Sequence, residues 1–200
     1  MWDLLDVFAV AGTQTDAETA TCIVESLLSL PEYQNARRIS VYLSMPSGEV
    51  HTAAIVRDAL SSGKKVFIPY FYKLSSPQPG HLASAMDMLE LDSLQDYDGL
   101  EADKWGIPTP TEESISRRNN CFGGRGKSEG EVVFREAREH GLDLVITPGL
   151  GFDGELRRIG RGMGFYDSFF ARCGTYSSLT GSRIPWTGQY TQLLSFGVAF

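Results

Sequence analysis

The sequence predicts an α/β protein, a single domain in which a mostly parallel sheet is flanked by helices on both faces, as in Rossmann-like three-layer folds. Expected helices alternate with short apolar strands, and this pattern places parallel strands between layers of helices. A length of 200 residues is enough for one domain with a sizeable core. Hydrophobic residues make up 42% of the chain and charged residues 22%, a balance typical of folded globular proteins. We therefore expect residues 1–200 to form one domain.

The first half of the chain alternates between helical and strand-like patterns. The expected helices are residues 16–30 and 52–62, and the expected strands are residues 38–44, 66–71 and 86–91. Pro31 ends the first helix, whose apolar residues form one broad face. Thr52 is the expected cap of the second helix, and Gly63 lies just past its end. The strands are recognised by short runs of β-branched and other apolar residues.

The second half begins with a predicted surface loop at residues 109–130, which are rich in Pro, Ser, Asn, Gly and mixed charges. The expected elements after it are a helix at residues 131–140, a strand at 142–147, a helix at 165–172 and a strand at 193–200. In open parallel sheets, ligands bind beyond the carboxyl ends of the strands. The segment that follows Thr147 is therefore the first place to look for a functional site.

Charge and cysteine content exclude several classes of protein. The chain has 18 Lys and Arg against 25 Asp and Glu, a net charge of −7, so we expect no binding to nucleic acid. No run of 18 apolar residues occurs, and we expect no membrane-spanning helix. Three widely spaced cysteines do not form a disulfide framework or a zinc motif, and the acidic N-terminus is a poor signal peptide. A reducing cytoplasm is the expected location.

A glycine-rich segment at residues 148–167 follows the expected strand, and two interpretations of it compete. In the first, Gly149, Gly151 and Gly154 form the GxGxxG fingerprint of a dinucleotide-binding fold. That fingerprint requires a helix that starts at the third glycine and an acidic residue about 20 positions further on, after a second strand. The polar residues after Gly154 fit this context poorly, so a dinucleotide-dependent oxidoreductase is the weaker hypothesis.

In the second interpretation, residues 160–164 (Gly-Arg-Gly-Met-Gly) form a phosphate cradle at the start of a helix. Alternating glycines let backbone N–H groups converge on an anion, and the helix beginning at Phe165 adds its positive end. Arg158 and Arg161 are candidate phosphate ligands, and Asp167 is a suitable oxygen ligand for Mg²⁺. The alternative is a flexible glycine loop with solvated arginines.

The segment Gly-Arg-Gly-Met-Gly-Phe-Tyr-Asp at residues 160–167, after residues 142–153, resembles the signature of the 5-formyltetrahydrofolate cyclo-ligase family, also called 5,10-methenyltetrahydrofolate synthetase. Further segments similar to the family are residues 32–45, 63–69, 86–88 and 104–110. The resemblance implies a monomeric, ATP- and Mg²⁺-dependent cytoplasmic ligase. ATP would phosphorylate the formyl oxygen of 5-formyltetrahydrofolate, and nitrogen N10 would then close the ring and expel phosphate. Such chemistry depends on alignment and charge neutralisation.

The resemblance also implies roles for individual residues. The ATP-binding residues would be Arg158, Ile159, Gly160, Arg161, Gly162, Met163, Gly164, Phe165 and Tyr166. Among these, Arg161 and Tyr166 would be catalytic. The folate-binding residues would be Leu43, Glu49, Trp105 and Phe165. Asp167 would bind the magnesium ion. Without the family, Leu43 is by default a core residue, Glu49 a solvated loop carboxylate, and Trp105 part of a hydrophobic corner.

Three departures from the family pattern support an alternative function. Met163 stands where many members carry Lys or Gly. The chain has no basic residue before Arg37, whereas members usually begin with a basic helix, and it ends where members continue to another acidic metal ligand. All three departures affect the ATP side. The alternative is therefore a truncated or catalytically impaired relative that binds folate or nucleotide without turnover.

Overall fold

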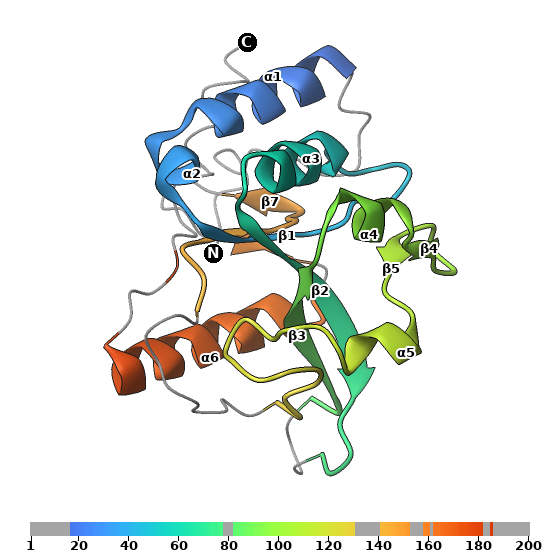
Figure 1. Cartoon of the computed structure of the whole chain (residues 1–200), viewed down its shortest axis with the longest axis vertical. Coiled ribbons are helices and arrows are strands. Elements are labelled where there is room, and N and C mark those ends of the chain that lie inside the picture. The colour runs from blue at the N-terminus through green and yellow to red at the C-terminus, as the bar shows by residue number, and fades with distance from the viewer. Residues whose placement is uncertain are drawn as a thin grey trace, which may run out of the picture.

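A four-stranded sheet lies at the centre of the computed structural model, in the strand order β3-β2-β1-β6 (Figure 1). The structure describes residues 17–77, 82–130, 141–152, 158–160, 162–181 and 185. The strands of this sheet are β1 (Arg38–Val41), β2 (Lys65–Lys73), β3 (Ser84–Leu91) and β6 (Leu144–Ile146). β1 pairs in parallel with both β2 and β6, and β3 pairs antiparallel with β2. The predicted mostly parallel sheet is confirmed, with β3 as an antiparallel edge strand.

Helices cover both faces of the sheet, as predicted (Figure 1). α1 (Ala17–Ser29), α2 (Pro31–Asn35) and α3 (Ala53–Ser61) lie on one side, and α6 (Phe165–Thr180) lies on the other. α6 continues eight residues beyond the predicted end at Arg172 and ends at Thr180, followed by Gly181 with a positive φ of 69°. The expected helix at residues 131–140 and the expected strand at residues 193–200 lie outside the described residues.

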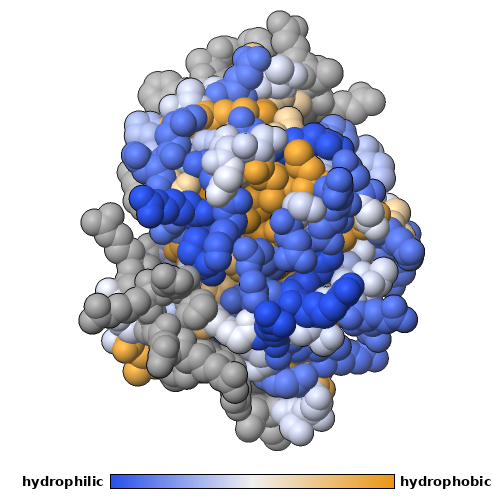
Figure 2. Space-filling view, viewed as in Figure 1, coloured by the Kyte–Doolittle hydropathy of each residue, from blue (hydrophilic) through white to orange (hydrophobic). Residues whose placement is uncertain are grey.

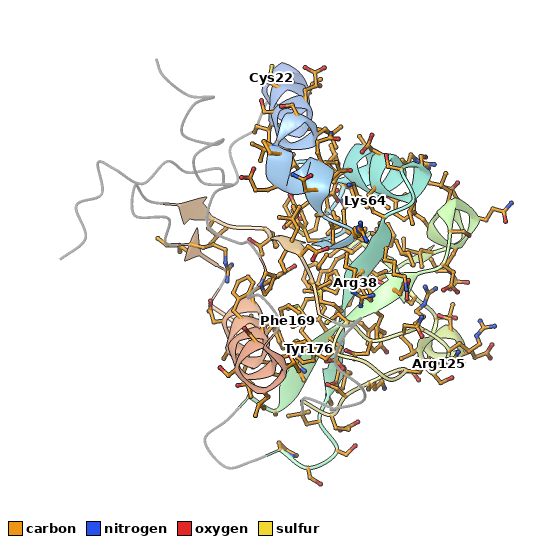
Figure 3. All side chains as sticks on the ribbon, turned by 60° about the vertical axis from the view of Figure 1, so that its left-hand side comes forward. Cys22, Arg38, Lys64, Arg125, Phe169 and Tyr176 are labelled. Atoms are coloured by element: carbon orange, nitrogen blue, oxygen red, sulfur yellow. The ribbon has the colours of Figure 1, made fainter. Side chains whose placement is uncertain are left out.

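Alternating side chains of the strands form two hydrophobic layers. Ile39, Val66 and Leu144 belong to the layer under α1 and α3, whereas Phe67 and Val145 belong to the layer under α6. Figure 3 shows Phe169 and Tyr176 directed from α6 toward the sheet, and both are buried. Because successive strand residues face opposite sides, a shift of one residue would exchange the two layers, and burial on both faces fixes the register.

Shorter elements complete the described part of the chain. They are α4 (Leu94–Asp98), β4 (Glu101–Ala102), β5 (Pro108–Thr109), α5 (Glu112–Ile115), β7 (Gly151–Phe152) and β8 (Arg158–Ile159). β4 pairs antiparallel with β5, and β7 pairs antiparallel with β8. Both pairs are hairpins of strands that follow each other in the chain. The β4–β5 hairpin comes after α4, and the β7–β8 hairpin comes after β6.

The prediction of a surface loop at residues 109–130 was wrong for much of the segment. Cys121 and Phe122 are buried in the layer under α6, and the Cys121 backbone N–H donates to the carbonyl of Met88 at 3.0 Å. Glu90 donates its own N–H to the carbonyl of Asn119 at 2.9 Å. The segment thus covers the open edge of β3, whose backbone groups need partners. These hydrogen bonds join backbone groups, so the side chains of the segment do not reveal them in the sequence.

One face of the molecule is largely hydrophilic, with a hydrophobic area over α3 and toward α4 (Figure 2). Leu60 of α3, together with Tyr97 and Leu100 around α4, is only partly buried against the core layer beneath α3. Within the described ranges, no helix combines the length and the apolar character needed to cross a bilayer.

Candidate active site

The candidate site lies beyond the carboxyl ends of the parallel strands. The segment after β1 carries Glu49, and the segment after β6 leads through the β7–β8 hairpin to the start of α6. β1 and β6 are parallel neighbours, so both segments leave the sheet at the same edge. This is the position at which open α/β sheets bind their ligands.

The loop between β1 and α3 holds Glu49 in a defined position. The Oε2 atom of Glu49 accepts a hydrogen bond from the Met45 backbone N–H at 3.0 Å. The hydroxyl of Tyr42 donates to the carbonyl of Val50 at 2.9 Å. Glu49 is partly exposed and Tyr42 is buried. Leu43, the other predicted folate residue of this segment, is 6% exposed and belongs to the core under α3, so its contact with folate stays a prediction.

The β4–β5 hairpin brings Trp105 to the same region. The Asp103 carboxylate accepts hydrogen bonds from the backbone N–H groups of Trp105 (2.8 Å) and Ile107 (2.9 Å), which shapes the hairpin tip. Trp105 is 64% exposed, so its ring is available to a ligand rather than closing a hydrophobic corner. Gly106 has a φ of 78°, and a Cβ atom there would lie 2.7 Å from Cγ of Pro46. The tip therefore touches the loop that carries Glu49.

The glycine-rich turn before α6 has the backbone pattern of an anion nest. Gly162 and Gly164 have φ values of 82° and 68°, on either side of Met163. Alternation of left-handed glycines with an ordinary residue turns successive N–H groups toward one point. α6 starts directly after Gly164, so its free N–H groups and positive dipole end lie at the same place. Met163 and Ile159 are 62% and 45% exposed.

Arg158 connects β8 to the first turn of α6. Its guanidinium donates to the carbonyl of Pro148 at 3.2 Å and to Oδ1 of Asp167 at 3.1 Å, and it lies 5.2 Å from the ring centroid of Tyr166. It also leaves little room beside Gly160, where a Cβ atom would lie 2.6 Å from Arg158 Nη1. In this arrangement Arg158 orients its neighbours, and its contact with a phosphate stays a prediction. Arg161, the other predicted phosphate ligand, lies outside the described residues.

Tyr42 follows β1, Tyr166 lies in the first turn of α6, and both side chains are buried. Burial raises the pKa of Tyr166, the nearby Tyr42 raises it further, Arg158 opposes the shift, and the charge of Glu49 adds to it. Burial also raises the pKa of Tyr42, and Glu49 again adds to the shift. Both phenols therefore remain protonated at neutral pH. Tyr166 can donate a hydrogen bond or order a ligand, but it is a poor general base.

Aromatic side chains line the approach to the glycine-rich turn. The rings of Phe165 and Phe71 meet edge to face, with centroids 4.9 Å apart. Phe71 belongs to β2 and is 49% exposed, and Leu82 lies 3.8 Å from a Cβ atom built on Gly164. Edge-to-face geometry is a favourable arrangement for aromatic pairs. Phe165 is thus held where the turn meets β2, next to surface that a planar ligand could cover.

Asp167 is the predicted magnesium ligand, and its side chain is 75% exposed. Among the described residues, three or more His, Cys, Asp or Glu side chains do not gather in a metal-binding group. Mg²⁺ is commonly held by one or two carboxylates, water and substrate phosphates instead of an all-protein cage. The donor set therefore fits a Mg²⁺ ion that arrives with a nucleotide.

Sequence reasoning missed a buried ion pair behind the site. Asp87 is 0% exposed and accepts hydrogen bonds from Arg172 (2.8 Å) and from the Tyr72 hydroxyl (2.8 Å). Ser128 donates to the same carboxylate through its backbone N–H and its hydroxyl. Arg172 also donates to the carbonyl of Met86. An aspartate in the middle of an apolar strand was the available signal, because a buried carboxylate needs a cation.

Gly151, the second glycine of the dinucleotide-binding fingerprint, lies in a short strand. Gly151 begins β7, which pairs antiparallel with Arg158 and Ile159 of β8. In the described part of the glycine-rich segment, the chain therefore enters a hairpin directly after Gly151, and Gly154 lies outside the described residues. The fingerprint requires its third glycine at a strand-to-helix junction. Among the residues of this segment that the structure describes, the first in a helix is Phe165.

The fold and the site define an α/β protein of the class that binds its ligands beyond the carboxyl ends of a parallel sheet, with a glycine-rich turn at a helix N-terminus. The chain belongs to the 5-formyltetrahydrofolate cyclo-ligase family, whose sequence model matches residues 2–189. The resemblance found at residues 160–167 is thereby confirmed over nearly the whole chain.

The chain is similar to several known proteins. The chain is 34% identical over 151 residues to the 5-formyltetrahydrofolate cyclo-ligase of Mus musculus, covering 76% of this chain and 62% of the mouse protein. It is 33% identical over 172 residues to the probable 5-formyltetrahydrofolate cyclo-ligase of Caenorhabditis elegans, covering 86% and 69%. The NMR structure of Aquifex aeolicus 5,10-methenyltetrahydrofolate synthetase has a TM-score of 0.48 at 21% identity, covering 78% and 61%. The chain spans less than two thirds of the mouse protein's length.

Proposed function

We propose that this protein converts 5-formyltetrahydrofolate and ATP into 5,10-methenyltetrahydrofolate, ADP and phosphate. The observation that carries the proposal is the meeting of three segments at one edge of the sheet. The loop with Glu49 touches the hairpin tip with Trp105 through Pro46 and Gly106. Because β1 and β6 are parallel neighbours, the segment that leads from β6 to the glycine-rich turn leaves the sheet at the same end as that loop. These are the segments that the family resemblance assigns to folate and to ATP.

The chemistry fits these residues in two steps. The formyl oxygen attacks the γ-phosphorus of ATP and ADP leaves, which gives an iminium phosphate. N10 then attacks the former formyl carbon, loses its proton and expels phosphate. The backbone N–H groups around Gly162 and Gly164, with the start of α6, would hold the phosphates and neutralise developing charge. Glu49 would accept hydrogen bonds from the N–H edge of the pterin, and the exposed ring of Trp105 would cover one side of the folate.

A magnesium ion would be held by Asp167 together with the nucleotide, and it would neutralise charge at the phosphates. In the structure this carboxylate is kept at the start of α6 by Arg158. Arg158 in turn is fixed by the Pro148 carbonyl, so the carboxylate has a defined place without a complete set of protein ligands. A nucleotide would provide the remaining oxygen donors.

The proposal is tested with purified protein, 5-formyltetrahydrofolate, ATP and Mg²⁺. We expect an absorbance increase from methenyltetrahydrofolate, with release of one phosphate per turnover and no reaction when ATP is omitted or Mg²⁺ is chelated. Binding of NAD(P) without binding of ATP would contradict the proposal. Glu49→Gln is expected to weaken folate binding more than ATP binding, because the charge faces the pterin and not the phosphates.

A second candidate function is a relative that binds folate or nucleotide without turnover, and Met163 favours it. This side chain is 62% exposed beside the glycine-rich turn and carries no charge. The resemblance places it where many family members carry Lys or Gly. A lysine there would add a charge-assisted contact to a phosphate. Binding of both substrates by calorimetry without product formation would support the second candidate over the first.

We further propose a monomeric, single-domain enzyme of the cytoplasm that does not act on nucleic acid. The net charge of −7 supports the last point, because nucleic-acid binding requires a basic surface. Cys22, Cys121 and Cys173 are free thiols, as expected in a reducing compartment. Light scattering of the purified protein would test the monomer, and a fluorescent fusion in cells would test the location.

A further inference from the structure

Thr52 occupies the position just before α3, yet its side chain serves the loop that carries Glu49. The side chain is buried, with 1% of the residue exposed. Its Oγ1 donates a 2.6 Å hydrogen bond to the carbonyl of Tyr42 and accepts one from the backbone N–H of Ser44 at 3.3 Å. The sequence predicts Thr52 as a helix cap, but the hydroxyl is directed toward the end of β1 instead.

The loop is closed at its base by reciprocal contacts between Thr52 and Ser44. The backbone N–H of Thr52 donates to Oγ of Ser44 at 3.4 Å, while the backbone N–H of Ser44 donates to Oγ1 of Thr52. Each residue thus supplies one side-chain oxygen and one backbone donor. Residues 45–51 between them form a short closed loop whose two ends are held by buried or half-buried bonds.

A third bond fixes the loop next to Glu49 itself. Tyr42, at the end of β1, donates its hydroxyl proton to the carbonyl of Val50 in a buried hydrogen bond of 2.9 Å. Val50 follows Glu49 directly, and the Glu49 carboxylate is bonded to the Met45 N–H from inside the loop. The backbone of Glu49 is therefore held by the strand end through Tyr42, and its side chain is held by the loop.

We propose that Thr52 and Tyr42 are positioning residues that hold Glu49 at the geometry needed to bind the reduced pterin. This inference rests on the function proposed above. Hydrogen bonds to a flat ligand edge require placement within about 0.5 Å, and such placement depends on supporting bonds behind the ligand-binding residue. Thr52 and Tyr42 are both buried, so we expect them to act on Glu49 without touching the ligand.

The test compares Thr52→Val with Thr52→Ser. Valine keeps the shape of the side chain but removes both hydrogen bonds of the hydroxyl, whereas serine keeps the hydroxyl. For Thr52→Val we expect the KM for 5-formyltetrahydrofolate to rise at least tenfold, with the KM for ATP within twofold of wild type. For Thr52→Ser we expect both KM values within twofold of wild type. A merely structural role would lower the melting temperature without separating the two substrates.

Tyr42→Phe provides a second, independent variant, because it removes only the hydroxyl that bonds to Val50. We expect the same selective rise in the KM for folate. The inference is overturned if wild type is active and both Thr52→Val and Tyr42→Phe leave the folate KM unchanged, or raise both KM values equally. If wild type neither binds nor converts 5-formyltetrahydrofolate, the proposed function fails as well. If it binds without turnover, calorimetric dissociation constants replace KM and the same selective change is expected.

Discussion

The Nη2 atom of Arg158 lies 3.1 Å from Oδ1 of Asp167, so the β7–β8 hairpin is joined to the first turn of α6. The two partners differ in burial, with 14% of the Arg158 side chain exposed and 75% of the Asp167 side chain. Arg158 is anchored by the carbonyl of Pro148, whereas Asp167 faces solvent. The pair thus presents a carboxylate beside the glycine-rich turn, where a nucleotide-bound cation would approach.

Asp167→Asn is predicted to weaken the use of Mg²⁺ and ATP with little effect on stability. We expect the magnesium concentration for half-maximal rate to rise about tenfold or more, because a charged oxygen ligand is lost. An exposed ion pair contributes only about 0–1 kcal/mol, so the melting temperature should change little. The matched control is Asp98→Asn, which removes an exposed partner of Arg57 on α3, where both side chains are about half exposed. Equal effects of the two substitutions on magnesium dependence would contradict the role of Asp167.

Met163→Lys is predicted to raise the rate of methenyltetrahydrofolate formation. One charge-assisted contact is worth about 1.5–3 kcal/mol, which corresponds to a factor of roughly 10 to 100. The control is Leu179→Lys near the end of α6, because Leu179 is as exposed as Met163 (61% against 62%) and α6 carries it away from the turn. Steady-state kinetics at saturating substrates measure both. No gain for Met163→Lys, or the same gain for Leu179→Lys, would show that the methionine at position 163 does not limit the reaction rate.

Gly106→Ala is predicted to raise the KM for folate by displacing the tip that carries Trp105. The substitution places a methyl group 2.7 Å from Cγ of Pro46 and also forces an L residue into a φ of 78°. Gly63→Ala is the control, since Gly63 has a φ of 75° but open space around a Cβ atom. Both variants should lose about 1–2 kcal/mol of stability from the left-handed backbone. Only Gly106→Ala should change the folate KM, so equal kinetics in the two variants would argue against the contact.

The layered fold was predictable because its signals are local. β-branched runs predicted the strands, and Pro31 and Gly63 marked helix ends that the structure has at Ser29 and Ser61. The packing of residues 119–121 against the edge strand β3 was not predictable. These residues pair with β3 through backbone hydrogen bonds, which leave no apolar pattern in the sequence.

The site was predictable only where one segment carries several of its residues. Residues 158–167 contain the glycines, Arg158 and Asp167, and the structure brings Arg158 and Asp167 together as neighbours. The supporting residues come from other elements. Asp103 shapes the turn that presents Trp105. The Thr52 hydroxyl does not cap α3 as expected, but bonds to the Tyr42 carbonyl at the base of the Glu49 loop. Asp and Thr are common in turns, so the sequence alone does not mark Asp103 and Thr52 as supporting residues. Their roles become visible only in the tertiary contacts.

Asp87→Asn is predicted to destabilise the protein while sparing the affinity for folate. Residues 86–88 are one of the segments similar to the family, but Asp87 is fully buried and bonds to Arg172. Removing one partner of a buried ion pair costs about 3–5 kcal/mol, because the other charge is left uncompensated. Urea unfolding measures this loss, and Asp98→Asn again serves as the exposed control. A loss below about 1 kcal/mol, or a selective rise in the folate KM at low temperature, would contradict this prediction.

Tyr72 is predicted to make stability fall in strongly alkaline solution. Burial, together with the charge of Asp87, raises its pKa from 10.0 to about 12. Below pH 10 both states keep the proton, and the contribution is complete. Between pH 10 and 12 only the unfolded state releases the proton, so stability falls by up to about 1.4 kcal/mol per pH unit for this group.

Urea unfolding of wild type and Tyr72→Phe across this range measures how the free energy of unfolding changes with pH. The phenylalanine variant starts from a lower stability, because it lacks the hydrogen bond to Asp87, but its slope should be shallower. Parallel slopes would show that Tyr72 does not titrate in this way.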